Sequence, residues 1–421
     1  MKHFLKKFIP VFLINRYHWL QTFLGAFWYR FPSKNIKVIA ITGTNGKSTT
    51  VDLTTRILEE AGFKVASASS INFKIQDKYR PNKLRMTMMG GFQLQKFLRQ
   101  AIDAGCEYVV LEITSEGIKQ YRHKFINFEL AAITNLTPEH IESHKGFENY
   151  KKAKGKLFQA VKNIHIVNLD DEHRDYFLKF PADKKYAYTM NSEQRTQNNN
   201  DLFIVHCLLF TANQNGITFK VQDVDFNLKL LGKFNIYNAL AAICIGLSQG
   251  IDLETCQKAL IEAKGIPGRM ETVISKPFRV IVDYAFTPNA LEQVYKTIKN
   301  NFNPQKMICV FGSCGGGRDK WKRPVLGELA AKYCDEVIIT NEDPYDENPM
   351  EIINQIFEGT QGKAFKILKR REAIKKALSL AKEDDTVIIT GKGSEPSICF
   401  AKGKQISWDD RKVVREEFKK L

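Results

Sequence analysis

The residues best suited to bind phosphate lie in a short Gly-rich stretch, residues 42–49, with the sequence TGTNGKST. The stretch follows the apolar, strand-like run Val38–Ile41 and precedes a helix-like pattern. Glycines in such a turn let backbone N–H groups point at phosphate oxygens beside a helix N-terminus. The ammonium of Lys47 can reach β- and γ-phosphates, and the hydroxyl of Ser48 can bind Mg²⁺. We therefore predict an ATP site rather than an ordinary strand–turn–helix, although Ile41 stands where the full phosphate-loop pattern has another glycine. The residues of this predicted site are Gly43, Thr44, Asn45, Gly46, Lys47, Ser48 and Thr49.

An acidic side chain ends the next strongly apolar run, Tyr108–Ile113. In an open α/β sheet the carboxyl ends of the strands face the ligand crevice. Glu112 is thus either a Mg²⁺ ligand or water-positioning carboxylate, or the last exposed residue of its strand. Because a charge is rarely placed in such a run without a partner, we favour the functional reading.

A lysine lies within the apolar stripe of a predicted helix that contains Tyr150, Lys154 and Phe158 at four-residue spacing. This helix follows a strand at 129–133 and the loop 134–140, which ends in His140. A lysine in such a stripe either extends its ammonium to water or, if buried, has a lowered pKa. The residues alone leave both readings open.

Two asparagines open a helix of small apolar residues that ends near Gly250. Asn235 and Asn238 either cap this helix or contact an adenine edge through their carboxamides. A new series of alternating strands and helices starts after the segment 265–269, where we place a domain boundary. We predict strands at 280–282, 307–311, 337–340, 365–368 and 387–390.

The chain of 421 residues is too long for one typical core. We predict an α/β protein with a central phosphate-loop ATPase domain containing a parallel-rich sheet (36–265), followed by a Rossmann-like α/β domain (266–421). The net charge of +17 suits anionic partners, but no basic stripe is interleaved with aromatic residues, so we expect no nucleic-acid partner. The eight scattered cysteines form no Cys-x-x-Cys pair, which favours buried free thiols in a cytoplasmic protein.

Residues 1–35 carry six Lys or Arg residues and no acidic residue, between apolar and aromatic runs. These runs are too short and too interrupted for a spanning helix of ~20 residues, and no small-residue cleavage site indicates a secretory signal. Two readings remain open: a basic segment on the anionic inner face of the membrane, or a helix packed on the ATPase domain.

In this order the motifs resemble the Mur ligases, most closely the UDP-N-acetylmuramoyl-tripeptide synthetase branch. The resemblance runs from about Lys37 to the end of the chain. The motifs that carry it are Thr42–Thr50, Glu112–Gly117, Thr134–His140, Tyr150–Phe158, Gly232–Ala242, Gly268–Glu271, Val282–Ala285, Gly312–Arg323, Thr340–Pro349, Gly391–Glu395 and Asp409–Arg411.

The resemblance implies an ATP-dependent ligase of peptidoglycan biosynthesis that joins a carboxylate to the amine of an amino acid through an acyl phosphate. By the same resemblance, Lys47 holds the phosphates and Ser48 and Glu112 hold one Mg²⁺. His140 is expected to bind a second Mg²⁺, with Lys154 as the family's carbamylated lysine. The remaining cofactor contacts implied are Asn235 and Asn238 at the adenine, Arg269 at the phosphates and Asp283 at the ribose. The expected enzyme is a monomer.

The resemblance also implies a set of substrate-binding residues for the nucleotide-linked muramoyl peptide and the amino acid. These are Thr87, Thr114, Ser115, Arg122, Arg318, Glu342, Asp343, Tyr345, Gly391 and Glu395.

Two features depart from the branch. Its members begin with a domain that grips UDP, where this sequence has about 35 residues before the phosphate-loop strand. Where diaminopimelate-adding members read Asp-Asn-Pro-Arg, this chain has Glu342-Asp343-Pro344-Tyr345, and tyrosine cannot form the bidentate carboxylate pair of arginine.

These departures keep two other functions open. One is a Mur-like ligase acting on a different carboxylate, such as a folylpolyglutamate-type acceptor. The other is a membrane-associated ATP-binding scaffold without catalysis, which the presence of Lys47, Glu112, His140 and Lys154 argues against. We expect the incoming amino acid to have a side chain that does not end in a carboxylate–amine pair.

Overall fold

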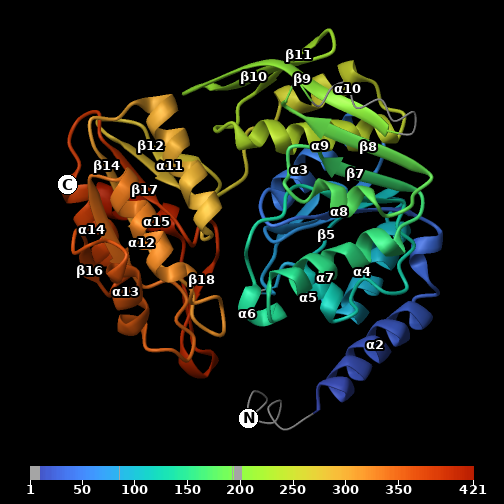
Figure 1. The fold of residues 1–421 in the computed structure, drawn as a ribbon, viewed down its shortest axis with the longest axis horizontal. Coiled ribbons are helices and arrows are strands. Elements are labelled where there is room, and N and C mark those ends of the chain that lie inside the picture. The colour runs from blue at the N-terminus through green and yellow to red at the C-terminus, as the bar shows by residue number, and fades with distance from the viewer. Residues whose placement is uncertain (1–9, 85, 192, 194–201) are drawn as a thin grey trace.

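The computed structural model describes residues 10–84, 86–191, 193 and 202–421. It contains two large β-sheets, each with helices on both faces (Figure 1). This confirms the predicted α/β class with two sheet domains. Most of the polar tract 191–200 lies outside the described residues.

The first sheet is parallel in its centre and antiparallel at its two ends. The strands β9, β8, β7, β6, β1, β5 and β2 pair in parallel in that order. Hairpins extend both ends. In sheet order the strands are β11 (Val224–Leu228), β10 (Gly216–Val221), β9 (Leu202–Asn213), β8 (Lys184–Thr189), β7 (Ile164–Asn168), β6 (Leu130–Ile133), β1 (Lys37–Thr42), β5 (Tyr108–Glu112), β2 (Val65–Ala68), β3 (Asn72–Ile75) and β4 (Lys78–Pro81).

Two apolar cores cover the two faces of this sheet because alternate residues of each buried strand point to opposite sides. On one face the core contains α3 (Lys47–Glu60), α9 (Phe234–Ser248) and α10 (Leu253–Ile261). On the other face it contains α4 (Gly91–Asp103) and α7 (Phe147–Ala160). The short helices α5 (Ser115–Lys119), α6 (Ile141–His144) and α8 (Arg174–Leu178) lie in the connections.

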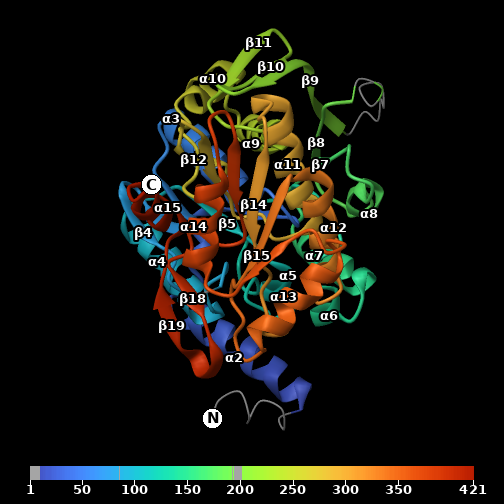
Figure 2. The same ribbon diagram turned by 90° about the vertical axis from the view of Figure 1, so that its left-hand side faces the viewer.

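The second sheet has the order β12-β13-β17-β14-β15-β16, with β12 antiparallel and the others parallel. Helices α11 to α13 lie on one face and α14 and α15 on the other (Figure 2). All five predicted strands of this half are present. The elements are β12 (Glu271–Ile274), β13 (Arg279–Val282), α11 (Pro288–Phe302), β14 (Met307–Phe311), α12 (Lys322–Tyr333), β15 (Glu336–Thr340), α13 (Pro349–Glu358), β16 (Phe365–Ile367), α14 (Arg370–Leu380), β17 (Thr386–Ile389), β18 (Ser397–Cys399), β19 (Gln405–Ser407) and α15 (Asp410–Phe418).

The N-terminal helix α2 (Val11–Trp28) packs on α4 along the edge of the first domain (Figure 1). Small residues allow the two helices to approach closely. A Cβ added at Gly91 would lie 1.9 Å from the Thr22 hydroxyl, and one at Gly25 would lie 2.7 Å from the Cα of Phe92. The packed-helix reading of this segment therefore holds for the inner face of α2. No helix in the described part of the chain is long and apolar enough to span a membrane.

The outer face of α2 is apolar and open to solvent. Five residues at alternating four- and three-residue spacing form this outer stripe, each 46–64% exposed: Leu13, Tyr17, Leu20, Leu24 and Phe27. This spacing places them on one side of a helix. Trp28, at 74% exposure, borders the stripe. Exposed contiguous apolar surface of this kind indicates a contact site.

Candidate active site

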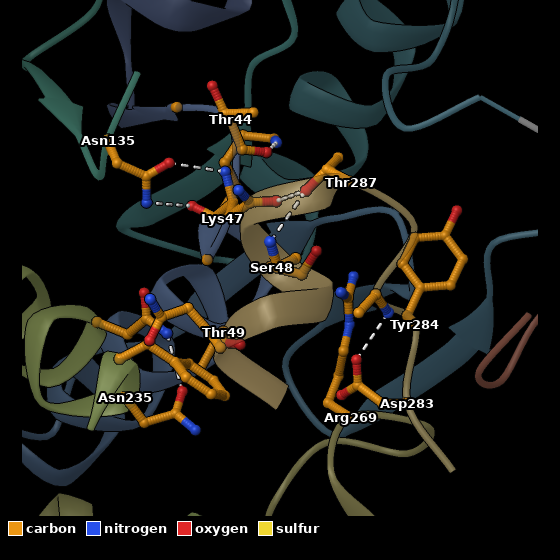
Figure 3. A pocket seen from close by; sticks show the side chains of 18 of the residues that line it. Thr44, Lys47, Ser48, Thr49, Asn135, Asn235, Arg269, Asp283, Tyr284 and Thr287 are labelled. Carbon is orange, nitrogen blue, oxygen red and sulfur yellow. Dashed lines mark hydrogen bonds between the residues drawn. The ribbon is translucent and has the colours of Figure 1, made fainter. Parts of the chain in front are cut away.

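A cavity of about 1040 Å³ lies between the two sheet domains and is lined by residues of both. Its floor is the phosphate loop, and its other walls come from the start of α9, from the segment 264–272 and from the loop after β13 (Figure 3). Cavities between domains are common places for small ligands because both domains contribute polar groups. This one gathers every residue predicted for the nucleotide and the metals.

The phosphate loop joins β1 to α3, and its two glycines have conformations that other residues rarely adopt. Gly43 has φ 145° and Gly46 has φ 83°. Added Cβ atoms would also collide, at 1.8 Å with the Thr134 hydroxyl for Gly43 and at 2.1 Å with Asn238 Oδ1 for Gly46. The turn therefore requires glycine at both positions, and it leaves its N–H groups at the start of α3 available to an anion.

Two oxygen ligands suited to a divalent cation lie at the end of β5 and at the start of α3. Ile41 of β1 is paired with Glu112 of β5, so Glu112 lies beside the loop that carries Ser48. The Ser48 hydroxyl donates to Glu112 Oε2 at 2.8 Å, and Glu112 is 4% exposed. Lys47 Nζ lies 3.8 Å from Glu112 Oε1. Among the described residues no three His, Cys, Asp or Glu side chains gather into a metal cluster. A hydroxyl and one carboxylate nevertheless fit Mg²⁺, which usually completes its shell with water and phosphate oxygens.

Lys154 is buried, as one of the two readings of its position predicted. It is 1% exposed, its Nζ donates to the Gly43 carbonyl at 2.7 Å, and it lies 4.8 Å from the centre of the Tyr150 ring. Burial and the nearby Lys47 lower its pKa well below the usual value. Glu112 takes its ion pair from Lys47 and not from Lys154. A buried amine with a lowered pKa is neutral more often at pH 7 and is then nucleophilic.

His140 lies on the same wall and is held as a neutral imidazole. Burial, with Arg318, Lys154, Lys322 and Lys47 nearby, lowers the pKa of His140 to about 2. The neutral form is the one that binds metal ions. Its backbone is left-handed, with φ 58° and ψ 26°, immediately before α6. His140 and Lys154 both line the cavity close to the phosphate loop.

The two asparagines at the start of α9 do not cap it, so that reading of the sequence is wrong. The N-cap residue is Lys233, with no side-chain cap. Asn235 Nδ2 donates to the Leu231 carbonyl and Asn238 Nδ2 donates to Asn235 Oδ1, both at 2.8 Å. This pair places Asn238 against Gly46 and fixes both amides at the cavity wall.

Arg269 and Asp283 approach the cavity from the second domain (Figure 3). The Asp283 carboxylate accepts hydrogen bonds from Met270 N at 2.7 Å and Ala285 N at 2.6 Å. Burial raises the pKa of Asp283 and the Arg269 guanidinium opposes this shift. Arg269 lies 4.4 Å from the Tyr284 ring centre, which orients its cationic end.

The predicted substrate residues fall into two groups, with Arg122 in neither. Thr87, Thr114, Ser115 and Arg318 line the cavity with the nucleotide residues. Arg122 does not line it and donates to the Met88 carbonyl at 2.6 Å. The other five also lie outside the cavity lining, around the loop after β15: Glu342, Asp343, Tyr345, Gly391 and Glu395.

Asp343 and Glu395 are joined by Lys392, which the sequence predictions did not single out. Its ammonium lies 3.0 and 2.9 Å from the two Asp343 oxygens and also pairs with Glu395. Glu395 in turn accepts from the Tyr284 hydroxyl at 2.8 Å, which connects the group to the cavity. Glu342 is 2% exposed, and burial raises its pKa. The signal for Lys392 was its place between the glycines 391 and 393.

The sequence predictions also missed two residues that hold the phosphate loop. Asn135 Oδ1 accepts from Asn45 N at 2.9 Å, and the Thr287 hydroxyl lies 3.4 Å from Asn45 Oδ1 (Figure 3). Asn135 follows the strand β6, which pairs with β1. Its position after a parallel strand was the available signal.

Comparison with known proteins identifies this arrangement. Residues 41–246 match the Mur ligase middle domain, and residues 268–393 match the Mur ligase glutamate ligase domain. A UDP-N-acetylmuramoyl-L-alanyl-D-glutamate–2,6-diaminopimelate ligase from Syntrophomonas wolfei is 37% identical over 406 residues, covering 93% of this chain and 80% of the relative. The ligase of the same name from Aquifex aeolicus is 37% identical and covers 91% of this chain and 78% of the relative.

Solved structures give the same result. A structure of a ligase with the same name has a TM-score of 0.62 and 30% identity, over 95% of this chain and 83% of the other. A folylpolyglutamate synthase from Mycobacterium tuberculosis has a TM-score of 0.68 at 16% identity, over 90% of this chain and 94% of the other, which shows a shared fold alone. Because both domain families match in order along most of the sequence, this chain belongs to the Mur ligase family of ATP-dependent acid–amino-acid ligases.

Proposed function

We propose that this enzyme adds an amino acid to UDP-N-acetylmuramoyl-L-alanyl-D-glutamate, the acceptor in the names of its relatives, in peptidoglycan synthesis. The observation that supports this most is the cavity itself. It joins a phosphate loop, a buried carboxylate at a strand end and cationic residues of the second domain in one space. Such a site suits transfer of a phosphoryl group to a carboxylate.

We propose that the chemistry proceeds through an acyl phosphate. The acceptor carboxylate attacks the γ-phosphorus of ATP, and the bond to the β-phosphate oxygen breaks to release ADP. The amine of the amino acid then attacks the acyl carbon, loses a proton, and expels phosphate. Lys47 and the backbone N–H groups of the phosphate loop hold the transferring group, and Arg269 adds a second positive charge. Ser48 and Glu112 would hold one Mg²⁺ and His140 a second, and the bound ions would neutralise charge on the phosphates.

We further propose that Lys154 is carbamylated in the working enzyme. Its buried amine is 2.7 Å from the Gly43 carbonyl, beside the same loop as Ser48 and Glu112. Reaction of the neutral amine with CO₂ forms an N–C bond and releases a proton, which turns a neutral group into a negatively charged carbamate. That change would supply a negative ligand where the described residues offer few acids.

The identity of the amino acid rests on the loop after β15. The relatives are named for 2,6-diaminopimelate, but Tyr345 stands where arginine would pair with the distal carboxylate of that substrate. The loop also carries Glu342 and Asp343, and Lys392 pairs with Asp343 and Glu395 there. We therefore retain the prediction that the added side chain does not end in a carboxylate–amine pair.

The direct test is a phosphate-release screen of the full chain with ATP and Mg²⁺. Acceptors are UDP-muramoyl peptides and, as controls, folates, each offered with single amino acids. We expect release to require both UDP-N-acetylmuramoyl-L-alanyl-D-glutamate and one amino acid, with product of the expected mass. Release with a folate and glutamate alone would instead support the folylpolyglutamate-type function, for which the fold alone gives no evidence of substrate.

We also propose that the enzyme is a cytoplasmic monomer that contacts anionic membrane through residues 1–35. The outer stripe of α2 offers apolar and aromatic side chains, and no acidic residue occurs before Asp52. An amphipathic or aromatic helix beside basic residues binds anionic lipid by burying apolar area and by charge attraction.

A flotation experiment with vesicles containing anionic phospholipid tests this contact. Leu20→Gln with Leu24→Gln should reduce the floated fraction at least threefold while the melting temperature changes by less than ~4 °C, since both residues are about half exposed. Leu209→Gln, at an exposed apolar residue on the far hairpin (73% exposed), is the matched control. Equal flotation of the α2 variant and the control would contradict the membrane contact.

A further inference from the structure

Two loops from different domains meet beside His140. Residues 139–140 lead into α6 of the first domain, and residues 318–321 precede α12 of the second. The Asp319 carboxylate accepts from Ile141 N at 3.1 Å and from Glu142 N at 3.0 Å. Helix α6 has no side-chain cap of its own, and the first N–H groups of a helix need acceptors. Asp319 therefore caps α6 from the other domain.

A buried ion pair holds the same loop from its other end. Lys322 Nζ lies 2.9 Å from Glu139 Oε1, and both side chains are 3% exposed. The Lys320 backbone N–H also donates to Glu142 Oε1 at 2.6 Å. Removing one partner of a buried pair leaves a charge without compensation, which is strongly destabilising. Separation of the two loops would therefore cost more than loss of an exposed salt bridge.

The residue between these two contacts is His140, in the left-handed conformation. That conformation is unfavourable for a residue with a side chain and persists only where its surroundings fix it. On the side of the phosphate loop, Thr137 N donates to the Thr44 hydroxyl at 3.0 Å. The first domain thus fixes the start of this loop, and the second domain fixes the residues on either side of His140.

We propose that Asp319 and Lys322 form an interdomain clasp that positions His140. When the second domain closes onto the first, the clasp sets the imidazole of His140 in place. The same closing brings Arg318, the neighbour of Asp319, to face the cavity, and only then is the site at His140 complete. Asp319 and Lys322 act through His140 and are positioning residues. The link between the clasp and the reaction rests on the role of His140 in the proposed function. The existence of the clasp does not rest on that role.

Backbone hydrogen exchange of the full chain without ligands tests the clasp directly. In Asp319→Asn the amides of Ile141 and Glu142 should exchange at least tenfold faster than in the parent, because one carboxylate oxygen becomes an amide donor. The control is Asp252→Asn, which alters a cap of α10 that accepts from Thr255 N at 2.7 Å, far in sequence from residues 139–144. It should leave the exchange of residues 139–144 unchanged. Unchanged exchange in Asp319→Asn would overturn the clasp, whatever the ligase activity.

The ion pair gives a second test that does not depend on Asp319. Lys322→Met should lower the melting temperature, and Glu139→Gln in the same chain should restore more than half of the loss, because the uncompensated carboxylate is gone. If the two substitutions instead lower the melting temperature independently and additively, Lys322 and Glu139 are not energetically coupled. That result would overturn this half of the clasp.

Steady-state kinetics then tests the link to the reaction. In Asp319→Asn we expect kcat to fall at least tenfold and the Mg²⁺ concentration for half-maximal rate to rise, while ADP affinity stays within twofold because the phosphate loop is untouched. Faster exchange with unchanged kcat and Mg²⁺ dependence would overturn the positioning of His140. A parent enzyme without ligase activity would instead refute the proposed function and leave the exchange result standing.

Discussion

The side of the site proposed to bind phosphate (the phosphate side) and the side proposed to bind the amino acid (the amino-acid side) are built in different ways. On the phosphate side, Glu112 ends β5, and Ser48 begins α3 directly after the loop that follows the neighbouring parallel strand β1. The pairing of β1 with β5 and the turn of this loop bring the two side chains within 2.8 Å. On the amino-acid side, Asp343 and Glu395 come from loops and meet through a third loop residue, Lys392. The first arrangement changes little when surrounding residues change, whereas the second depends on each partner. Variation in substrate choice is therefore expected on the amino-acid side.

The largest effect is expected on the phosphate side. Lys47→Ala removes the cation that holds the transferring phosphate, worth several kcal/mol in the transition state, so acceptor-dependent phosphate release should fall by about 10³-fold. The control is Lys64→Ala, at an exposed lysine in the connection between α3 and β2. This variant should retain full activity. A rate for Lys47→Ala within tenfold of the parent would contradict the assignment.

Lys154→Ala should have the next largest effect, a loss of about 10²-fold, in line with removal of a single charge-stabilising group. Because the missing group is a carboxylate in the carbamylated enzyme, acetate or another short carboxylate should restore part of the activity. Intact-mass measurement of the parent at high bicarbonate should show added CO₂. Near-parental activity of the variant, or a bare amine at high bicarbonate, would refute the carbamate.

The crowding of cations on the phosphate side should also appear in stability. His140 has a pKa of about 2 when folded and ordinarily 6.5 when unfolded, so between these values the unfolded chain binds more protons. The contribution of the neutral His140 to the free energy of unfolding is complete above pH 6.5. It decreases as the pH falls below 6.5, and about 2 kcal/mol is lost at pH 5. Denaturant unfolding at pH 7.5 and 5 measures how much unfolding free energy each protein loses on acidification. This loss should be smaller in His140→Gln than in the parent by the same amount. Equal acid losses in both proteins would mean that His140 is not held neutral.

The smallest effect is expected from a single change on the amino-acid side. Tyr345→Arg adds a cation next to the acidic loop and should raise kcat/KM for diaminopimelate about tenfold relative to lysine, as expected for one charge-assisted hydrogen bond. Phe365→Arg, at a 41% exposed residue of β16, controls for added charge. Strong and exclusive use of diaminopimelate by the parent would show that another basic residue already fills this role.

The sequence predicted which residues of the phosphate side lie together in one cavity, because the signals there are local. The glycines 43 and 46, the acid at the end of β5 and the lysine in the apolar stripe of α7 each follow from turn chemistry or residue spacing. The clasp between Asp319 and residues 141–142 could not be predicted, since its partners are about 178 positions apart and belong to different sheets. The same holds for Lys392, whose contact with Asp343 joins two loops 49 positions apart.

The sequence was least informative for α2. Its aromatic and basic residues left a packed helix and a membrane-bound segment as alternatives. The structure shows one helix with an inner face packed against α4 and an outer apolar stripe, so the inner and outer faces have different environments. Periodicity alone gave no polar face to orient such a helix, because apolar residues occur on both sides.

The most direct test of the account is oxygen transfer from the acceptor to phosphate. With the acceptor carboxylate labelled with ¹⁸O, attack of that carboxylate on the γ-phosphorus places one labelled oxygen in the phosphate that is later released. We predict one ¹⁸O in each released phosphate in the presence of ATP, Mg²⁺ and the amino acid, and none without the acceptor. Amide product formed together with unlabelled phosphate would contradict an acyl-phosphate ligase in this cavity.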